Sequence, residues 1–346
     1  MPQILTEIPL PGALPFDEII DVRAPAEFDE DHIPGAVNLP VLSDAERARV
    51  GTIYVREDRF LARKIGAALV ARNAADHIET ALADRGGGWR PLVYCWRGGQ
   101  RSGSFASILS QIGWRVDIVE GGYRSYRRLV VEALYEREIG HRIVLVDGGT
   151  GTGKTQMLPR LAAAGQQVVD LEGLANHRGS NFGGWPEGQP AQKMFESRLA
   201  RQIAALDPAR PVFLEAESNS VGSLRLPPSL WAAMGRAEVV TLTAPVAARA
   251  RFLLTTYPDL TENTALLHAR IDRLRPYHAR DRIASWHGMA DAGALTDLTA
   301  ELIALHYDPR YRRADAQRRP VGDVALTDLS DGDLDRAAAR IVEMIA

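Results

Sequence analysis

The sequence predicts an α/β protein built from two domains. Its 346 residues exceed the length of a typical single domain. Short apolar strands alternate with amphipathic helices along most of the chain, a pattern typical of sheets with helices on their faces. Two glycine-containing loops, around Cys95 and before Lys154, each follow an apolar strand and precede a helix. We therefore assign residues 1–135 to an N-terminal domain with the first loop and residues 136–346 to a C-terminal domain with the second.

Composition limits the classes of protein that fit. A hydrophobic fraction of 46% is sufficient for ordinary packed cores, and a single cysteine excludes an intramolecular disulfide. No apolar run is long enough to cross a membrane, and the N-terminus lacks a signal-peptide pattern, so we expect a cytoplasmic protein without a membrane partner. The net charge of -3 gives no overall attraction to nucleic acid, but arginine clusters can still contact phosphates locally.

The N-terminal segment begins with a predicted strand at residues 19–23 that ends in a polar turn. Residues 24–40 follow as a short helix, with proline near its start, and a turn into a second strand. Turns commonly recruit side chains that hydrogen-bond to the backbone. We therefore interpret Asp21, Arg23 and His32 as structural hydrogen-bonding residues rather than catalytic ones.

The only cysteine, Cys95, lies between a buried strand at residues 90–94 and a helix at residues 102–112. Backbone amides of the intervening loop can converge on an enclosed space, and the helix N-terminus adds positive potential. A thiolate at this position would be stabilised and nucleophilic. A buried structural cysteine is the alternative, but arginines do not usually surround an inert thiol. The predicted anion-binding loop comprises Arg97, Gly98, Gly99, Gln100 and Arg101.

The remainder of the N-terminal domain is predicted as an interrupted helix at residues 44–72, a strand at residues 113–119 and a helix at residues 124–139. The last helix begins with a cluster of arginines, which fits either a solvated face or a contact with an anion or RNA. These candidate RNA-binding residues are Arg124, Arg127 and Arg128.

A complete phosphate-binding loop (P-loop) follows the apolar strand at residues 143–146 and leads into a helix that extends to residue 164. Its glycines expose backbone amides to an anion, Lys154 reaches the terminal phosphate, and the Thr155 hydroxyl can bind a magnesium ion. The predicted diphosphate-binding residues are Gly148, Gly149, Thr150, Gly151, Thr152, Gly153, Lys154 and Thr155.

Alternation continues after the P-loop and predicts a parallel sheet flanked by helices. The strands are expected at residues 167–171, 211–215 and 238–243, and a helix at residues 191–206. Ligands of such sheets bind beyond the carboxyl ends of the strands, where Asp170 and Glu215 fall. Either carboxylate can hold magnesium together with Thr155. We prefer Glu215, because a capping role is equally ordinary for Asp170.

The loop at residues 170–184 is rich in glycine and polar residues, as are many lids over active sites. His177 and Arg178 in this loop either contact a diphosphate or an RNA phosphate, or remain in solvent.

Further arginines recur with tyrosines on a helix predicted at residues 264–277, on the segment that follows it, and again at residues 307–313. Such faces suit RNA, but also plain solubility. The candidate RNA contacts here are Arg270, Arg273 and Arg280. The residues after 330 are predicted to form a closing helix.

The N-terminal motifs resemble those of rhodanese domains: an Asp-x-Arg-x-x-x-Glu-Phe stretch from Asp21, a His-Ile-Pro-Gly-Ala turn from His32, and the later cysteine loop. A rhodanese-like domain followed by a P-loop domain resembles the bacterial tRNA 2-selenouridine synthase family, over residues 19–313. Arg124 and Ala216 depart from that pattern, in which we expect a lysine and an acidic residue. The matching motifs are residues 46–52 with Tyr54, the Cys95 loop, residues 120–123, 148–155, 170–179 and 214–218, and residues 307–309 with Tyr311 and Arg312.

This resemblance implies a two-step replacement of sulfur by selenium at the wobble 2-thiouridine of tRNA. Geranyl diphosphate first alkylates the sulfur, and selenophosphate then supplies selenium through Cys95. The P-loop would hold the diphosphate with magnesium, and an enzyme that supplies selenophosphate is a further expected partner. Two other classes stay open at this point: a rhodanese-type sulfurtransferase with Cys95 as its only active site, and an RNA-binding P-loop NTPase. The sequence leaves open which tRNAs are bound, the oligomeric state, and whether a nucleotide also binds the P-loop.

Overall fold

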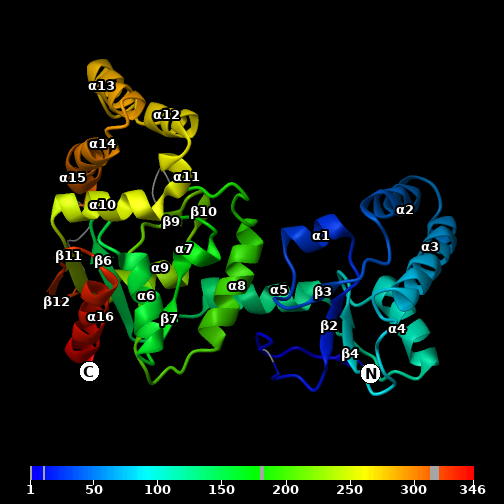
Figure 1. The fold of residues 1–346 in the computed structure, drawn as a ribbon. Helices are drawn as coiled ribbons and strands as arrows, with labels where there is room; N and C mark the ends of the chain where they lie inside the picture. Colours follow the sequence, from blue (N-terminus) through cyan, green and yellow to red (C-terminus); the bar gives the residue numbers. More distant parts are fainter. Residues whose placement is uncertain (1, 11, 180–182, 312–318) are drawn as a thin grey trace. The chain divides into compact units, whose positions relative to one another are not determined.

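The computed structural model describes residues 2–10, 12–179, 183–311 and 319–346 (Figure 1). The chain divides into two compact units. The first comprises Met1–Arg137 together with Pro190–Ala205, and the second comprises Glu138–Gln189 together with Leu206–Ala346. Each unit is built around its own five-stranded parallel sheet, which confirms the predicted α/β class.

In the first unit the strand order is β1-β5-β4-β2-β3. The central strand is short and apolar, and all four of its residues are buried, as expected for a parallel strand covered on both faces. Phe105 and Leu109 of the following helix pack on Val93 of this strand. The strands are β1 (Pro2–Gln3), β2 (Glu18–Asp21), β3 (Val37–Asn38), β4 (Pro91–Tyr94) and β5 (Asp117–Val119).

The helices of the first unit agree with the sequence prediction in place and differ at their ends. The interrupted helix is two helices, because Asp58 caps a new N-terminus by accepting a hydrogen bond from the Leu61 amide. The helix predicted at residues 124–139 ends earlier, in a π-helical turn. The elements are α1 (Pro25–Glu30), α2 (Asp44–Arg56), α3 (Arg59–Glu79), α4 (Gln100–Ile112), α5 (Tyr123–Val131) and the π-helical turn η1 (Glu132–Glu136).

Helix α8 (Gln192–Ala204) belongs to the first unit, although the sequence prediction placed it over the sheet that follows the P-loop. It packs against α5 and η1. Polar contacts join the same elements: buried Glu196 pairs with Arg127 and accepts a hydrogen bond from Tyr135. An apolar face indicates that a helix is covered, but it does not say by which sheet, so the order of elements along the chain misled the assignment.

In the second unit the strand order is β12-β11-β6-β8-β7, and all neighbours are parallel. The predicted strands at residues 143–146, 167–171, 211–215 and 238–243 are present. The last strand of the chain was not predicted, because four of its seven residues are polar or small and most are exposed at the sheet edge. The strands are β6 (Ile143–Gly148), β7 (Gln167–Val169), β8 (Val212–Glu215), β11 (Glu238–Thr243) and β12 (Arg319–Ala325).

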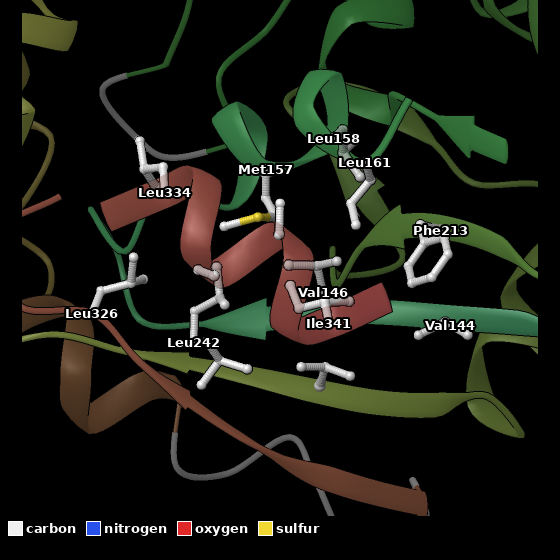
Figure 2. Packing of buried hydrophobic residues seen from close by; sticks show 14 of the residues in the cluster. Val144, Val146, Met157, Leu158, Leu161, Phe213, Leu242, Leu326, Leu334 and Ile341 are labelled. Atoms are coloured by element: carbon white, nitrogen blue, oxygen red, sulfur yellow. The ribbon is translucent and has the colours of Figure 1, made fainter. Parts of the chain in front are cut away.

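Two helices far apart in sequence close one hydrophobic core of this sheet. Figure 2 shows Met157 of α6 (Lys154–Ala163) and Ile341 of α16 (Asp331–Ile345) packed with Val146 and Leu242 of the central strands. The closing helix predicted after residue 330 is therefore confirmed. Burial of these side chains holds the strand before the P-loop and the helix after it in fixed positions.

A second, all-helical core follows β11 and centres on Trp286, which is fully buried. The helix predicted at residues 264–277 ends at Asp272, and turns follow it. The helices are α10 (Val246–Thr256), α11 (Pro258–Thr261), α12 (Thr264–Asp272), α13 (Arg280–Asp291), α14 (Leu295–Leu302), the π-helical turn η2 (Ile303–Tyr307) and α15 (Asp308–Tyr311).

The other elements of the second unit are a short helix after β7, a two-stranded hairpin and a helix before β11. They are α7 (Leu171–Leu174), β9 (Ser220–Val221) with β10 (Leu224–Arg225), and α9 (Pro228–Gly235). Within the described ranges, no helix combines the length and the apolar composition that a membrane crossing requires.

Candidate functional site

Cys95 lies directly after the central strand β4 and directly before the loop that starts α4. The residue is 3% exposed, and its Sγ is 3.1 Å from the hydroxyl oxygen of Ser102. Ser102 is fully buried in the first turn of α4. The strand fixes one side of the sulfur and the helix fixes the other, so the thiol has a defined position.

The environment of Cys95 favours the thiolate. Burial by itself would raise the pKa of this thiol. Hydrogen bonds from the Ser102 hydroxyl and from the amides of Ser102, Arg97 and Gly99 outweigh that effect, so the pKa of Cys95 is lowered. Backbone amides at the start of a helix therefore stabilise the charge, as the sequence predicts for an anion-binding loop.

The Cys95 loop is completed by the segment after β5, which the sequence analysis did not assign to the site. The amide of Tyr123 donates to the Cys95 carbonyl at 2.8 Å, and the amide of Arg124 donates to the Trp96 carbonyl at 3.2 Å. Gly122 has φ +61°, and a Cβ there would collide with the Cys95 carbonyl and the Gly98 amide. Only glycine allows these two backbones to approach so closely.

The charged residues around this loop divide into structural and exposed groups. Asp21 and Arg23 form a buried ion pair at 2.6 Å, and the guanidinium of Arg23 lies over the Tyr123 ring, which confirms their structural interpretation. Arg101 pairs with Glu27 at 2.7 Å. Arg97 is exposed at the rim of the loop.

A basic groove of about 620 Å³ adjoins the loop. Trp96 forms part of its wall, and its ring lies 5.2 Å from that of Tyr123. Arg124 and Arg128 are exposed in the groove, whereas Arg127 is held in ion pairs with Glu196 and Asp31. Of the arginines predicted on this helix, Arg124 and Arg128 are therefore placed to meet an anion, and Arg127 has a structural position. We name the basic groove by its residues Trp96, Arg97, Tyr123, Arg124, Arg128 and Lys193.

The P-loop connects β6, the central strand of the second sheet, to α6, as the motif predicts. The Lys154 ammonium donates to the carbonyl of Gly148 at 2.6 Å, so it lies across the loop. Together with Thr150 and Thr155 it lines a cleft of about 300 Å³. Of the P-loop residues named from the sequence, Thr150 to Thr155 line this cleft, whereas Gly148 and Gly149 do not.

Arg249 of α10 braces the P-loop, and the sequence analysis missed it. Its Nε donates to the Thr150 carbonyl at 2.8 Å, and its two terminal nitrogens donate to Asp308 at 2.7 and 3.0 Å. A Cβ at Gly149 would collide with this guanidinium. The match at residues 307–309 was the only available signal, since Asp308 supplies the carboxylate that orients Arg249.

Four carboxylates lie beside the P-loop, those of Asp170, Glu172, Glu215 and Glu217. The Thr155 hydroxyl donates to Glu172 at 2.6 Å, and the Glu172 amide donates to fully buried Glu215 at 3.1 Å. Asp170 caps α7 by accepting from the Gly173 amide at 2.7 Å. The side chain that touches Thr155 is thus Glu172, which the sequence analysis did not select, rather than Asp170 or Glu215.

Burial and mutual repulsion raise the pKa values of Glu172, Glu215 and Glu217. Burial, followed by the charges of Asp170 and Glu172, raises the pKa of Glu215 well above its usual range. Burial and the charge of Glu172 raise the pKa of Glu217 to about 8. Burial also raises the pKa of Glu172, although Thr155 and Lys154 oppose the increase. A cation entering this cluster would relieve the repulsion.

The donor set fits a hard divalent cation such as Mg²⁺. Carboxylate and hydroxyl oxygens are available at Thr155, Glu172 and Glu217, and the Glu215 Oε2 atom is buried without a hydrogen-bond partner of ordinary geometry. Across the described parts of the chain, no three acidic, histidine or cysteine side chains form a ready-made metal site. Mg²⁺ is commonly held by one or two protein oxygens with substrate phosphates and water, so the set is adequate for that mode of binding.

Arg178 forms the far wall of the P-loop cleft. Its guanidinium lies 3.8 Å from the ring centroid of Trp185 and 4.3 Å from that of Tyr257, and it pairs with Asp259 at 2.9 Å. Burial, with Arg270 and Arg178 nearby, lowers the pKa of the adjacent His177. Arg178 therefore lines the cleft, and the alternative of a solvated loop residue is excluded. Residues 180–182 of the predicted lid lie outside the described residues.

The predicted tRNA-binding arginines of the second unit differ in exposure. Arg270 is partly buried and donates to the Gly184 carbonyl at 3.2 Å. Arg273 and Arg280 are exposed. Arg312 and Arg313 of the C-terminal cluster lie outside the described residues.

Family models and curated proteins were compared with the chain. Residues 10–129 match the rhodanese-like domain, and residues 141–278 match the tRNA 2-selenouridine synthase AAA domain. A tRNA 2-selenouridine synthase of Hahella chejuensis is 39% identical over 85% of this chain and 84% of its own length. Proteins of the same name from Bdellovibrio bacteriovorus and Nitrosomonas europaea are 36% and 35% identical, each over 67% of this chain. The match spans 62% and 61% of the length of those two relatives.

Proposed function

The chain belongs to the tRNA 2-selenouridine synthase family, and we propose on that premise that it converts 2-thiouridine in tRNA to 2-selenouridine. The observation that carries the proposal is a buried thiol of lowered pKa in an anion-binding loop, in a chain that also has a complete P-loop. A sulfurtransferase would need only the first site, and an NTPase would need only the second. A reaction with two anionic co-substrates uses both.

In the first step the P-loop binds geranyl diphosphate, and the sulfur of 2-thiouridine attacks the allylic carbon. A carbon–sulfur bond forms while the carbon–oxygen bond to diphosphate breaks, so negative charge builds up on the leaving group. Lys154 and the P-loop amides are arranged to bind that charge. The brace of Arg249 and Asp308 fixes the loop carbonyl of Thr150, so that the amides keep their direction.

A magnesium ion beside Thr155 and Glu172 supplies further neutralisation of the diphosphate when it is bound. The protein's own contribution is to hold the hydroxyl and carboxylate oxygens and the lysine along the same cleft. Glu217, with its raised pKa, can release a proton as a cation arrives.

In the second step the Cys95 thiolate attacks the phosphorus of selenophosphate. A sulfur–phosphorus bond forms, the phosphorus–selenium bond breaks with its electron pair on selenium, and selenide is released; water then cleaves the phosphocysteine, so that phosphate leaves and the thiol is restored. The released selenide is a strong nucleophile for the carbon that bears the alkylated sulfur, from which geranyl thiolate departs. The loop amides that lower the pKa of Cys95 also suit the tetrahedral anion, and the exposed Arg97 adds positive charge at the rim. Selenophosphate would be delivered by an enzyme that makes it.

The basic groove beside Cys95 is suited to bind the tRNA substrate. Trp96 offers an aromatic wall for a base, and Arg124 and Arg128 can bind phosphates. This proposal assigns the wobble base to the groove and leaves the exposed Arg273 and Arg280 for outlying contacts.

The test is conversion of thiolated tRNA by the purified protein with geranyl diphosphate, magnesium and selenophosphate, followed by mass spectrometry of the nucleosides. We expect geranylated 2-thiouridine when selenophosphate is omitted and 2-selenouridine when it is present. Rapid hydrolysis of ATP or GTP that tRNA stimulates, without either product, would favour an RNA-binding NTPase. Sulfur transfer from thiosulfate to Cys95, with no change in tRNA, would favour a sulfurtransferase.

A further inference from the structure

An apolar cavity adjoins the polar cleft of the P-loop within the second unit. It has a volume of about 80 Å³ and lies among α10, α11, α12, α14 and η2, which stand together in Figure 1. Leucines dominate its lining, and the few polar atoms are hydroxyl groups of threonine and tyrosine. We name it the leucine cavity by its residues Leu253, Leu254, Leu260, Leu267, Leu295, Leu298 and Leu302.

The leucine cavity and the P-loop cleft share a boundary. Thr150, Leu253 and Tyr257 line both spaces. Leu253 also packs directly on the P-loop, because a Cβ at Gly151 would lie 2.9 Å from its Cγ. A ligand whose phosphates occupy the P-loop therefore has its remaining atoms directed either to solvent or past these three residues into the cavity.

The chemistry of the lining selects the kind of ligand. A nucleotide base carries several hydrogen-bonding groups, and most of them would lose their partners among leucine side chains, at a large cost in affinity. A hydrocarbon chain has no such groups and gains by leaving water.

We propose that the leucine cavity binds the hydrocarbon tail of an allylic diphosphate whose head group lies in the P-loop, and that its depth sets the preferred chain length. The proposal rests on the proposed function, because it names the site where the alkyl donor of the first step is recognised. Tyr257 and Leu253 stand at the junction, where the allylic carbon would meet the diphosphate.

The experiment measures binding by calorimetry to the full chain with magnesium present. The ligands are inorganic diphosphate and the dimethylallyl, geranyl and farnesyl diphosphates. Each buried methylene strengthens binding by roughly fourfold, so we expect geranyl diphosphate to bind at least about tenfold more tightly than dimethylallyl diphosphate. Equal affinity for inorganic and geranyl diphosphate would overturn the proposal.

Two substitutions should move chain-length preference in opposite directions. Leu295→Trp narrows the cavity and should reduce the advantage of geranyl over inorganic diphosphate to within about threefold. Leu298→Ala deepens it and should raise the relative affinity for farnesyl diphosphate by about tenfold. Leu305→Trp is the matched control, since Leu305 is exposed on η2 and does not line the cavity.

The two levels of the hypothesis fail in different ways. If wild type geranylates thiolated tRNA but both cavity variants keep its chain-length preference, the proposed function stands and the leucine cavity is not the tail site. If ATP or GTP binds more tightly than geranyl diphosphate and Leu295→Trp weakens only the nucleotide, both the cavity assignment and the alkyl donor are wrong.

Discussion

The Cys95 loop and the P-loop share a local plan. Each joins the carboxyl end of a central parallel strand to the first turn of a helix, β4 to α4 and β6 to α6. Each loop is also held by a segment distant in sequence. The Tyr123 amide donates to the Cys95 carbonyl, an approach that Gly122 makes possible, and the Arg249 guanidinium donates to the Thr150 carbonyl. Both loops thus use backbone amides and a helix start to attract an anion.

They differ in the group that each loop leaves ready to react. The first holds a thiol whose pKa is lowered by hydrogen-bond donors. The second holds a lysine and faces carboxylates whose pKa values are raised by burial and by one another. The first arrangement suits nucleophilic attack by the thiolate on selenophosphate. The second suits neutralisation of charge on a bound diphosphate, with a cation between the loop and the acids.

The sharpest way to separate the two loops is Cys95→Ser. A serine hydroxyl is barely ionised at neutral pH and is a far weaker nucleophile toward selenophosphate, whereas alkylation by a diphosphate requires no thiol. We expect accumulation of geranylated tRNA and complete loss of selenouridine, measured by chromatography of digested tRNA. Selenouridine at the wild-type level would show that Cys95 is not the nucleophile that releases selenium. Loss of both products would mean that the two steps depend on the same residue.

The converse substitution is Lys154→Ala. The diphosphate would lose a mobile cation, so we expect the rate of alkylation to fall by about a hundredfold or more. The control is the rate at which iodoacetamide alkylates Cys95, which should stay within about twofold of wild type because the thiol belongs to the other unit. Normal geranylation by this variant would contradict the role given to the P-loop.

The brace behind the P-loop predicts a smaller effect. Arg249→Lys keeps the charge but cannot bind Asp308 with two parallel hydrogen bonds while also reaching the Thr150 carbonyl. We expect the affinity for inorganic diphosphate to fall by about tenfold, measured by calorimetry. Arg251→Lys, on the exposed side of the same helix, is the matched control. Unchanged affinity in the Arg249 variant would reduce the brace to a packing contact.

Ser102→Ala tests what lowers the pKa of Cys95. Removing the hydroxyl deletes the largest of the contributions that oppose burial, so the pKa of the thiol should rise. At pH 7 a smaller fraction of Cys95 is then present as thiolate. The rate of alkylation by iodoacetamide falls by about tenfold for each unit by which the pKa rises, and we expect it to slow by several fold. The pH profile of that rate should shift to higher pH, whereas Ser104→Ala on the exposed face of α4 should leave it in place. A profile that does not move would assign the lowered pKa to the backbone amides alone.

Sequence patterns were sufficient where a site is continuous in the chain. Both loops, their strands and their helices follow from local spacing, and Cys95 and Lys154 lie where that spacing predicts. The sequence also selected Arg178 as a candidate phosphate contact. It did not predict that the guanidinium lies against the rings of Trp185 and Tyr257.

Patterns failed where a site depends on distant segments. Nothing in the sequence around Arg249 distinguishes it from other helical arginines. Its role follows only from the fold, which places Thr150 and Asp308 within hydrogen-bonding distance of it. Glu172 was passed over in favour of Glu215, because a carboxylate at a strand end is the usual signal, whereas the short helix α7 carries Glu172 back to Thr155. Helix α8 was assigned to the wrong sheet for a related reason: its apolar face records that it is covered, but not by which elements.

The smallest expected effect concerns which unit holds the tRNA. Each phosphate contact that is lost lowers the slope of log affinity against log salt by roughly 0.7 to 0.9. If the basic groove binds the substrate, replacing Arg124 and Arg128 with alanine should lower the slope by about 1.5 and weaken binding several fold at moderate salt. Replacing Arg273 and Arg280 gives the matched pair, since both are also exposed arginines.

Electrophoretic mobility shifts with thiolated tRNA over a range of salt concentrations distinguish three outcomes for these arginine pairs. A reduced slope for the first pair alone places the tRNA at the Cys95 loop. Reduced slopes for both pairs mean that the tRNA backbone contacts the two units, as it must if one base visits both anion sites in turn. A reduced slope for the second pair alone would contradict the groove assignment, because the wobble base would then be recognised beside the P-loop. The selenide released at the Cys95 loop would then have to leave that loop before it reached the tRNA.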